Sequence, residues 1–380
     1  MLGYIPGHFY GFVMVKPFSY QFYRTTASAW DAMYQAMLIA QKSIYWEIYI
    51  FVDDEAGNRF VDVLCDKARA GVDVKIVIDA IGSWGLSRLA EARLKGAGVE
   101  VLRYNRLHPE LAVGKWIGRL WRRNHRKVLI IDEEIVFLGG VNVEYKAFDW
   151  DDVYLRLTGR VTRPLLKSFA RSYIRAGGSK HRVRHLFKFK KENPFEALQK
   201  KIHFIFHSPL YQNMSPFRRF YQRGFDMARE SINLLTPYFV PDPAFLHLMA
   251  SARRRGVKVN LFLPVRPDYK IMEWITRAYQ GLAHRSGANV FLLPRMNHGK
   301  AMTVDRRLGV VGSSNVTPRS WYFNEEAGVY FDDEEMTTDL DAIFDTWKQE
   351  SHPLNLENWQ KRGFMNKTKE WIAKLLESFV

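Results

Sequence analysis

Two short segments of the chain carry the same pattern of chemically active side chains. Residues 124–132 read N-H-R-K-V-L-I-I-D and residues 297–305 read N-H-G-K-A-M-T-V-D. The pattern is H-x-K-x4-D, and its members are His125, Lys127, Asp132, His298, Lys300 and Asp305. A glycine and an asparagine follow each histidine at the same distances of 14 and 17 residues, as Gly139, Asn142, Gly312 and Asn315. A single copy would more often be the rim of an ordinary strand, but two copies with matching sequels indicate a duplicated functional unit.

Paired histidines, lysines and asparagines suit the transfer of a phosphodiester group. A neutral imidazole can attack phosphorus and form a covalent intermediate, while a second, protonated imidazole donates to the leaving oxygen. Lysines and asparagines would then surround the non-bridging oxygens, whose charge must be stabilised as phosphorus becomes five-coordinate. Neither clustered carboxylates nor a cysteine cluster accompanies the motifs, since the chain has only Cys65, so no metal or other cofactor is expected.

The spacing within each motif separates its aspartate from its histidine and lysine. Side chains alternate between the two faces of a strand, so His125 and Lys127 share one face while Asp132 points to the other. The apolar run after Lys127 is typical of a buried strand. We therefore expect the histidine and lysine to form the wall of an active site, and Asp132 and Asp305 to give structural support.

The elements that must position these residues are also duplicated. An aromatic and β-branched run begins at Ser43, and a similar run begins at Ser231. Each is followed by a helical pattern that ends at a glycine, Gly71 or Gly256, and then by a further apolar run. Strands that alternate with helices at this spacing predict an α/β fold, and 380 residues are enough for two such sheets.

The composition restricts the partners of this protein. Its net charge of +16 favours polyanions, either nucleic acid or anionic lipid headgroups. No stretch reaches the roughly 18 to 20 apolar residues that span a bilayer. Three segments have the composition of membrane-binding segments and equally of ordinary solvated structure, and the sequence leaves both interpretations open. They are an amphipathic insert at 107–123 just before the first motif, a basic stretch at 179–191, and the ending at 369–380.

Both motif copies resemble the H-x-K-x4-D motif of the phospholipase D superfamily, and the chain is most similar to bacterial cardiolipin synthases of the short type without transmembrane helices. The similarity extends over about residues 26–350. Its further markers are E-I-Y-I-F-V-D-D at 47–54, T-P-Y-F-V-P-D at 236–242, G-G-V-N at 139–142, W-D-D at 150–152, and G-S-S-N followed by Ser320, Asn324 and Glu326.

The resemblance implies two tandem phospholipase D-like domains of α/β class. Each would be a mixed β-sheet flanked by helices, and pseudo-twofold symmetry would place the active site at their interface. The expected organisation is an N-terminal segment at 1–25, a first domain at 26–175, a basic linker at 176–200, a second domain at 201–350 and a C-terminal amphipathic helix at 351–380.

The resemblance also implies roles for individual residues. His125 is expected to be the nucleophile and His298 the acid and base, with Lys127, Lys300, Asn142 and Asn315 binding phosphate. In this family an acidic residue downstream of each motif orients the histidine, which suggests Asp152 in the first half and Glu326 in the second. A carboxylate on the far ring nitrogen fixes the tautomer and supports the imidazolium form.

The function implied is that of a cytoplasmic enzyme, peripheral on the inner face of the cell membrane. It would transfer a phosphatidyl group from one phosphatidylglycerol to another through phosphohistidine, and release glycerol. The same residues would also suit a phospholipase D-type hydrolase or a nuclease acting on DNA or RNA, and the positive charge fits a nucleic acid equally well. The apolar character of the insert and of the C-terminal segment favours lipid. A non-catalytic lipid-binding scaffold is disfavoured because both motifs are intact.

Overall fold

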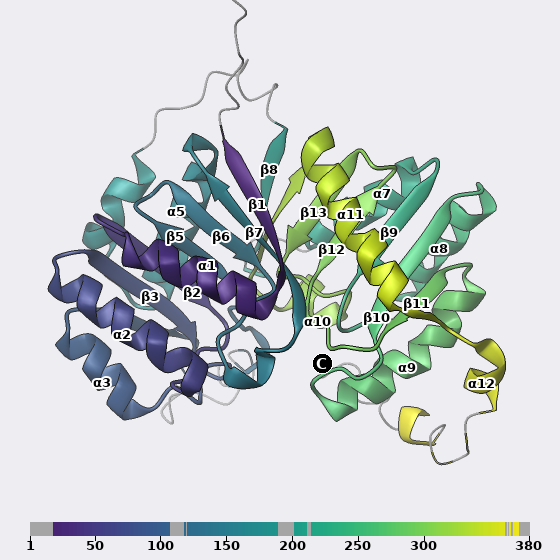
Figure 1. Cartoon of the computed structure of the whole chain (residues 1–380), viewed down its shortest axis with the longest axis horizontal. Coiled ribbons are helices and arrows are strands. Elements are labelled where there is room, and N and C mark those ends of the chain that lie inside the picture. The colour runs from purple at the N-terminus through teal and green to yellow at the C-terminus, as the bar shows by residue number, and fades with distance from the viewer. Residues whose placement is uncertain are drawn as a thin grey trace, which may run out of the picture.

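The protein consists of two α/β halves that lie side by side (Figure 1). The computed structural model describes residues 18–106, 118, 120–188, 201–210, 214–361, 363, 365 and 368–371. Each half is built on one mixed β-sheet, which confirms the predicted fold class.

The first sheet has seven strands in the described part of the chain, in the order β1-β7-β6-β5-β2-β3-β4. Strands β2, β3 and β4 run parallel to one another, and the other neighbours are antiparallel. The strands are β1 (Ser19–Thr25), β2 (Ser43–Ile48), β3 (Asp73–Asp79), β4 (Glu100–Tyr104), β5 (Val128–Ile131), β6 (Ile135–Gly139) and β7 (Asp151–Thr158).

The second sheet repeats this arrangement. Its order, β8-β14-β13-β12-β9-β10-β11-β15, matches the first sheet strand for strand and adds β15 at the edge among the described residues. The strands are β8 (Ile202–His207), β9 (Ser231–Leu235), β10 (Lys258–Pro264), β11 (Asn289–Leu293), β12 (Ala301–Val304), β13 (Leu308–Gly312), β14 (Glu326–Phe331) and β15 (His352–Pro353). The motif strands β5 and β12 occupy the same place in the two sheets, as the duplication predicts.

Helices flank both faces of each sheet. The helices of the first half are α1 (Thr26–Leu38), α2 (Glu55–Arg69), α3 (Arg88–Gly96) and α5 (Arg163–Arg175). Those of the second half are α7 (Pro216–Met227), α8 (Pro243–Arg254), α9 (Lys270–Arg285), α10 (Pro318–Tyr322), α11 (Glu334–Glu350) and α12 (Leu356–Gln360). Short 3₁₀ helices are η1 (Tyr145–Ala147), η2 (Arg160–Thr162) and η3 (Lys180–Phe187).

The marker segments of the two halves begin equivalent helices. The Asp54 carboxylate accepts hydrogen bonds from the first-turn N–H groups of α2, and Asp242 does the same for α8. At the other end, Gly71 and Gly256 follow these helices with φ of 89° and 90°, a left-handed conformation that favours glycine. The same local rules therefore produce the same helix twice.

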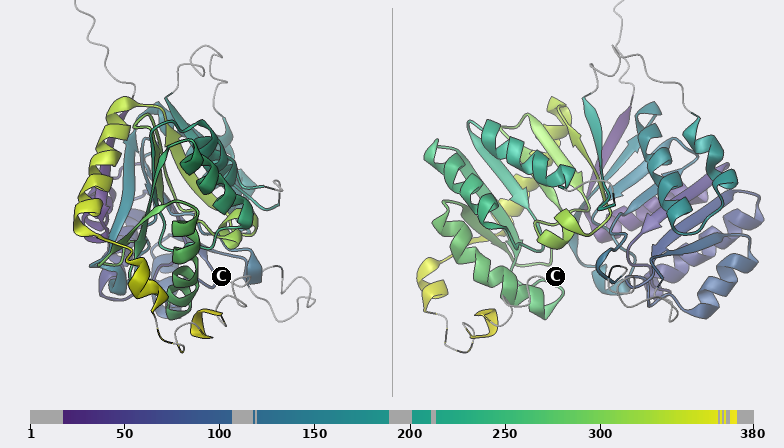
Figure 2. Two further views of the ribbon diagram at one scale, coloured as in Figure 1. Left: turned by 90° about the vertical axis from the view of Figure 1, so that its right-hand side faces the viewer. Right: turned by 180° about the vertical axis from the view of Figure 1, so that it is seen from behind.

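A shared core joins the halves. Apolar side chains from the inner faces of both sheets pack together with α5 and α11, and Phe169, Leu235 and Phe344 are examples that are all at most 1% exposed. Helix α5 contacts β8 of the second half, and α11 contacts β1 of the first. Figure 2 shows from two further sides that the halves form one body. This reciprocal exchange fits a pseudo-twofold relationship.

Three of the expected boundaries differ in the structure. Residues 19–25 are strand β1, which pairs with β7, so the first sheet starts before position 26. Within the expected linker, η3 packs on α5 and buries Val183 and Leu186. The segment from 351 is not a single helix where it is described, because β15 pairs with β11 and α12 follows it. Edge strands depend on partners far away in the chain, which a local pattern does not reveal.

Two of the three segments with possible membrane character lie largely outside the described residues: most of 107–123 and, in the ending at 369–380, residues 372–380. Of the basic stretch at 179–191, the structure describes residues 179–188, which contain η3. Within the ranges that the structure describes, no helix is both long and apolar enough to cross a membrane.

Candidate active site

Each motif histidine lies just before its motif strand, where the backbone pairs with the opposite half. The N–H of His125 donates to the carbonyl of Glu325 (2.9 Å), and the N–H of His298 donates to the carbonyl of Asp151 (2.8 Å). Two parallel β-bridges thus cross the interface. These bridges hold His125 against β14 of the second half and His298 against β7 of the first half. The two motifs are thereby brought to one place.

The carboxylates that orient the histidines come from the opposite halves. Nδ1 of His125 lies 3.0 Å from a carboxylate oxygen of Glu326, and Nδ1 of His298 lies 3.4 Å from Asp152. The expectation that each carboxylate orients the histidine of its own half is therefore wrong. The crossing follows from the β-bridges, since Glu326 comes directly after Glu325 and Asp152 directly after Asp151.

The two histidines are held differently. His125 Nδ1 faces both oxygens of Glu326, at 3.0 and 3.1 Å, and Glu326 also accepts a hydrogen bond from the Ser313 hydroxyl. His298 Nδ1 lies 3.1 Å from the Gly140 carbonyl, closer than it is to Asp152. A carbonyl only accepts, so Nδ1 of His298 carries a proton and Nε2 carries the lone pair of the neutral ring.

Gly140 is required by this close approach. A Cβ at position 140 would lie 2.5 Å from an Asp152 oxygen and 2.7 Å from the His298 carbonyl. Both neighbours belong to the site and cannot withdraw without moving it. The second glycine of the G-G-V-N marker is thus explained by packing beside His298.

Both motif lysines are buried beside their histidines. Nζ of Lys127 donates to the His125 carbonyl at 2.8 Å and lies 4.9 Å from the centre of the Tyr49 ring. Nζ of Lys300 donates to the His298 carbonyl. Lys127 and Lys300 are 1% and 2% exposed, so the site holds two ammonium groups with almost no access to solvent.

Burial shifts the pKa values of the histidines, the lysines and Glu326 away from their ordinary values. Desolvation and the Lys127 charge hold the pKa of His125 well below its usual range, and desolvation and Lys300 also lower the pKa of His298. Desolvation lowers the pKa of Lys300 to about 8, and that of Lys127 well below its usual range. Burial raises the pKa of Glu326 to about 7. The site is therefore short of negative charge and suited to an anion.

A cavity of about 260 Å³ joins the two motifs. Its lining side chains come from both halves: Tyr49, Ile50, His125, Asn142, Tyr238, Asp268, Tyr269, Ile271, Met272, His298, Asn315, Thr317, Arg319, Ser320 and Asn324. The amide oxygen of Asn142 accepts from the Ile50 N–H at 3.3 Å, which leaves its NH₂ group as a donor for the cavity. Asn315 holds the equivalent place, and its backbone N–H is bound to the Ser320 hydroxyl.

The motif aspartates lie at the other end of their strands. Asp132 accepts hydrogen bonds from the backbone N–H groups of Gln41, Lys42 and Ser43, at 2.6–3.1 Å. Asp305 accepts equivalent bonds from residues 229–231 at 2.8–2.9 Å. Each carboxylate ties the turn after the motif strand to the start of the neighbouring strand, and neither contacts the cavity.

Several lining residues were not predicted from the motifs. Tyr49 and Tyr238 pack edge-on against His125 and His298, with ring centroids 4.9 and 6.3 Å apart. Both tyrosines lie in the aromatic marker segments, which were used only to support the resemblance. Asp268 and Tyr269 lie in the loop after β10. The sequence feature that could have identified them is their position just after the carboxyl end of a parallel strand, where α/β folds bind ligands.

Behind the cavity, a buried ionic network holds the two halves together. Glu325 pairs with Arg126 at 2.8 Å and with Arg175 at 2.7 Å, and Arg126 also donates to the backbone carbonyl of Glu326. Because Arg126 follows His125 directly, the network fixes the backbone on both sides of the His125–Glu326 pair.

Two pairs of buried histidines and lysines, brought together by two matching α/β halves, define a phospholipase D-type site. The family described as cardiolipin synthase, PLD-like domain, matches residues 33–171 and 221–347, and the chain belongs to it. A probable cardiolipin synthase of Bacillus subtilis is 31% identical over 90% of this chain and 68% of its own length. A cardiolipin synthase of Clostridium perfringens is 29% identical over 92% of this chain and 74% of its own length.

A solved structure supports the fold independently. The phosphatidylserine synthase of Haemophilus influenzae superposes with a TM-score of 0.71, covering 95% of this chain and 92% of its own, at 16% sequence identity. At that level of identity the similarity concerns the fold, with two tandem α/β halves in one chain.

Proposed function

We propose that this protein is a cardiolipin synthase-like phosphatidyltransferase that moves a phosphatidyl group from one phosphatidylglycerol to another. The observation that supports it most is the pair of histidines facing one cavity, each with its Nδ1 already bound. The Nε2 atoms are thereby left for chemistry, one as nucleophile and one as proton carrier. The curated relatives carry the name of this activity over nearly all of the chain.

In the first step, Nε2 of His125 attacks phosphorus and a phosphorus–nitrogen bond forms. The bond from phosphorus to the glycerol oxygen breaks, and that oxygen takes a proton from Nε2 of His298. In the second step, a hydroxyl of another phosphatidylglycerol attacks phosphorus and gives its proton back to His298, which breaks the phosphorus–nitrogen bond. No metal takes part in either step.

Charge stabilisation comes from the lysines and asparagines. Lys127 and Lys300 are buried, where hydrogen bonds to an anion are strong, and no rearrangement of solvent is needed as charge develops on the oxygens. The phosphodiester anion in turn favours the protonated forms of these lysines and of His298, opposing the lowering of their pKa values by burial.

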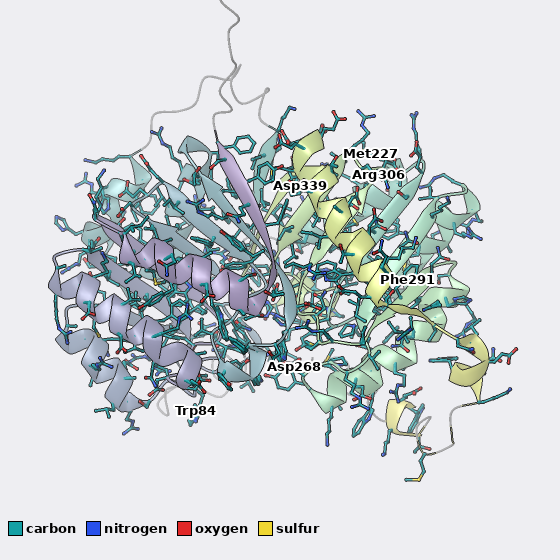
Figure 3. The ribbon with its side chains drawn as sticks, in the orientation of Figure 1. Trp84, Met227, Asp268, Phe291, Arg306 and Asp339 are labelled. Carbon is teal, nitrogen blue, oxygen red and sulfur yellow. The ribbon has the colours of Figure 1, made fainter. Side chains whose placement is uncertain are left out.

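Exposed aromatic residues surround the same edge of the molecule. Six of the seven exposed aromatic side chains among the described residues lie in the loops and short helices that follow strands at the cavity end of the sheets: Trp84, Tyr145, Phe148, Tyr269, Tyr322 and Phe323. Figure 3 places Trp84 at the same lower edge as Asp268. Aromatic side chains prefer the interfacial region of a membrane. We name these six residues the aromatic rim.

Basic side chains accompany the aromatic rim, which suits an anionic lipid surface. Arg88, Lys146 and Arg266 are exposed on or beside the same loops. The rim supports docking of the cavity onto phosphatidylglycerol headgroups while the acyl chains stay in the bilayer. With the net charge of +16, it supports a peripheral enzyme on the anionic inner face of the cell membrane.

The decisive experiment incubates purified protein with phosphatidylglycerol vesicles and resolves the lipid products by mass spectrometry. Cardiolipin and free glycerol are expected from the wild type and should be absent with His125→Ala. Phosphatidic acid alone would replace the transferase with a hydrolase. An unchanged lipid pool would overturn the proposal and make DNA and RNA the next substrates to test.

A further inference from the structure

One carboxylate faces the cavity and is hydrogen-bonded to a tyrosine instead of to either histidine. Asp268 lies in the loop between β10 and α9, and it is the only acidic residue among the described residues that line the cavity. Glu326 and Asp152 are engaged with the imidazoles of His125 and His298. A free carboxylate weakens the attraction of the cavity for a phosphodiester anion, so its presence calls for a different ligand group.

Asp268 is fixed on the side of the cavity that holds His298. The hydroxyl of Tyr238 donates a hydrogen bond to Oδ1 of Asp268, and the Tyr238 ring packs edge-on against His298. Burial and Asp268 raise the pKa of Tyr238 well above its usual range, so its hydroxyl remains a donor. Oδ2 of Asp268 accepts no bond from the described residues and is available to a ligand.

The equivalent place in the first half has no such group. Tyr238 corresponds to Ile50, since Phe51 and Phe239 form matching bridges in the two halves and each comes one position later. Ile50 also lines the cavity. The two sides of the cavity therefore differ, although the catalytic pairs are duplicated: the Tyr238–Asp268 pair lies on the side of His298, and Tyr49 and Ile50 line the cavity without a carboxylate beside them.

We propose that Asp268 and Tyr238 form a hydroxyl-binding subsite for the glycerol headgroup, used by the leaving glycerol and by the acceptor. A carboxylate binds the hydroxyls of a polyol through charge-assisted hydrogen bonds. Leaving and attacking oxygens both exchange a proton with the acid and base histidine, so the polyol must lie beside that histidine. The subsite therefore fits His298 as acid and base and His125 as nucleophile, and it rests on the proposed transferase function.

Glycerol exchange tests this subsite directly. Phosphatidylglycerol vesicles are incubated with deuterated glycerol or with propan-1-ol, and the labelled phosphatidylglycerol and phosphatidylpropanol are measured. Propan-1-ol has one hydroxyl, which must attack phosphorus, and so cannot also bind Asp268. Asp268→Asn should raise the KM for glycerol by about 10- to 100-fold, the range for a hydrogen bond to a charged group, and should change the KM for propan-1-ol little. Loss of the contact to the leaving glycerol slows the first step equally in both reactions, so the comparison uses the KM values of the two acceptors and not the rates.

Two further variants complete the test. Tyr238→Phe should also raise the KM for glycerol relative to the KM for propan-1-ol. Oδ1 of Asp268 then loses the hydrogen bond that holds the carboxylate in place, while the ring stays against His298. Glu273→Gln is the matched control, since this carboxylate of α9 pairs with Arg277 and does not line the cavity. It should leave both reactions unchanged.

The outcomes separate the subsite from the proposed function. An equal rise of the KM for glycerol and of the KM for propan-1-ol in Asp268→Asn would mean that Asp268 acts through His298, and would overturn the subsite. Unchanged glycerol exchange would overturn it as well. A wild-type protein that gives neither exchange product nor cardiolipin would overturn the transferase itself, and the subsite with it.

Discussion

The imidazole of His125 lies 3.0 Å from the carboxylate of Glu326, although 201 residues separate them in the chain. His298 and Asp152 make the reciprocal pair at 3.4 Å. Each half thus supplies a histidine to the site and a carboxylate to the histidine of the other half. Neither half alone contains an oriented histidine, so the chemistry depends on the docking of both.

The unequal surroundings of the two histidines predict unequal effects of removing their carboxylates. Glu326→Gln should lower kcat by about 100-fold or more, because a neutral amide cannot stabilise the imidazolium of His125 and can favour the wrong tautomer. Asp152→Asn should cost less, because the Gly140 carbonyl still holds Nδ1 of His298 at 3.1 Å. Steady-state kinetics on phosphatidylglycerol vesicles measure both. Equal losses would contradict the asymmetry.

The pH dependence of kcat/KM should form a narrow bell. Burial raises the pKa of Glu326 to about 7, so the carboxylate that supports His125 appears as pH rises through this value. Desolvation lowers the pKa of Lys300 to about 8, so its positive charge is lost as pH rises further. Activity of the free enzyme should therefore rise toward pH 7 and decline above it, because the pKa of His298, the proton donor, is lowered. Loss of the Lys300 charge should add a further fall near pH 8.

The alkaline limb of this profile has its own control. In Lys300→Arg the guanidinium stays protonated over the accessible range, so the fall near pH 8 should disappear whatever activity remains. A fall near pH 8 that persists in this variant would assign it to another group. The comparison uses the shape of the profile and does not depend on the maximum rate.

Much of this site follows from local sequence, because the motif residues repeat with the same spacing and a strand's alternation separates Asp132 from His125. The crossed carboxylates do not, since their pairing depends on backbone bridges such as that between His125 and Glu325, formed only when the halves dock. Asp268 was missed for a related reason. It lies in a loop whose counterpart in the first half, residues 80–87, carries no acidic residue, so only the folded cavity shows that it faces His298.

Asp132 should be important for stability and dispensable for chemistry. Its carboxylate accepts three backbone N–H groups, which Asp132→Ala would leave unpaired. Hydrogen bonds to charged groups are worth about 1.5–3 kcal/mol each, so we expect a loss of at least about 2 kcal/mol in the free energy of unfolding. Urea denaturation gives that value. Specific activity, corrected for the folded fraction, should stay within about twofold of wild type, and a loss comparable to that of His125→Ala would give the aspartate a catalytic role.

Removal of an aromatic-rim side chain should weaken membrane binding without altering the cavity. Trp84 is 84% exposed at the edge shared with Asp268 and does not line the cavity, so Trp84→Ala should reduce flotation with phosphatidylglycerol vesicles. Ile39, 66% exposed just after α1, lies before β2 and so at the opposite edge of the sheet, which makes Ile39→Ala the matched control. Exchange of glycerol on a short-chain phosphatidylglycerol below its micelle concentration should be equal in both variants and wild type. If Trp84→Ala and Ile39→Ala bind the vesicles equally well, the enzyme docks by another face. If Trp84→Ala also loses glycerol exchange on the short-chain lipid, Trp84 supports the fold and not membrane binding.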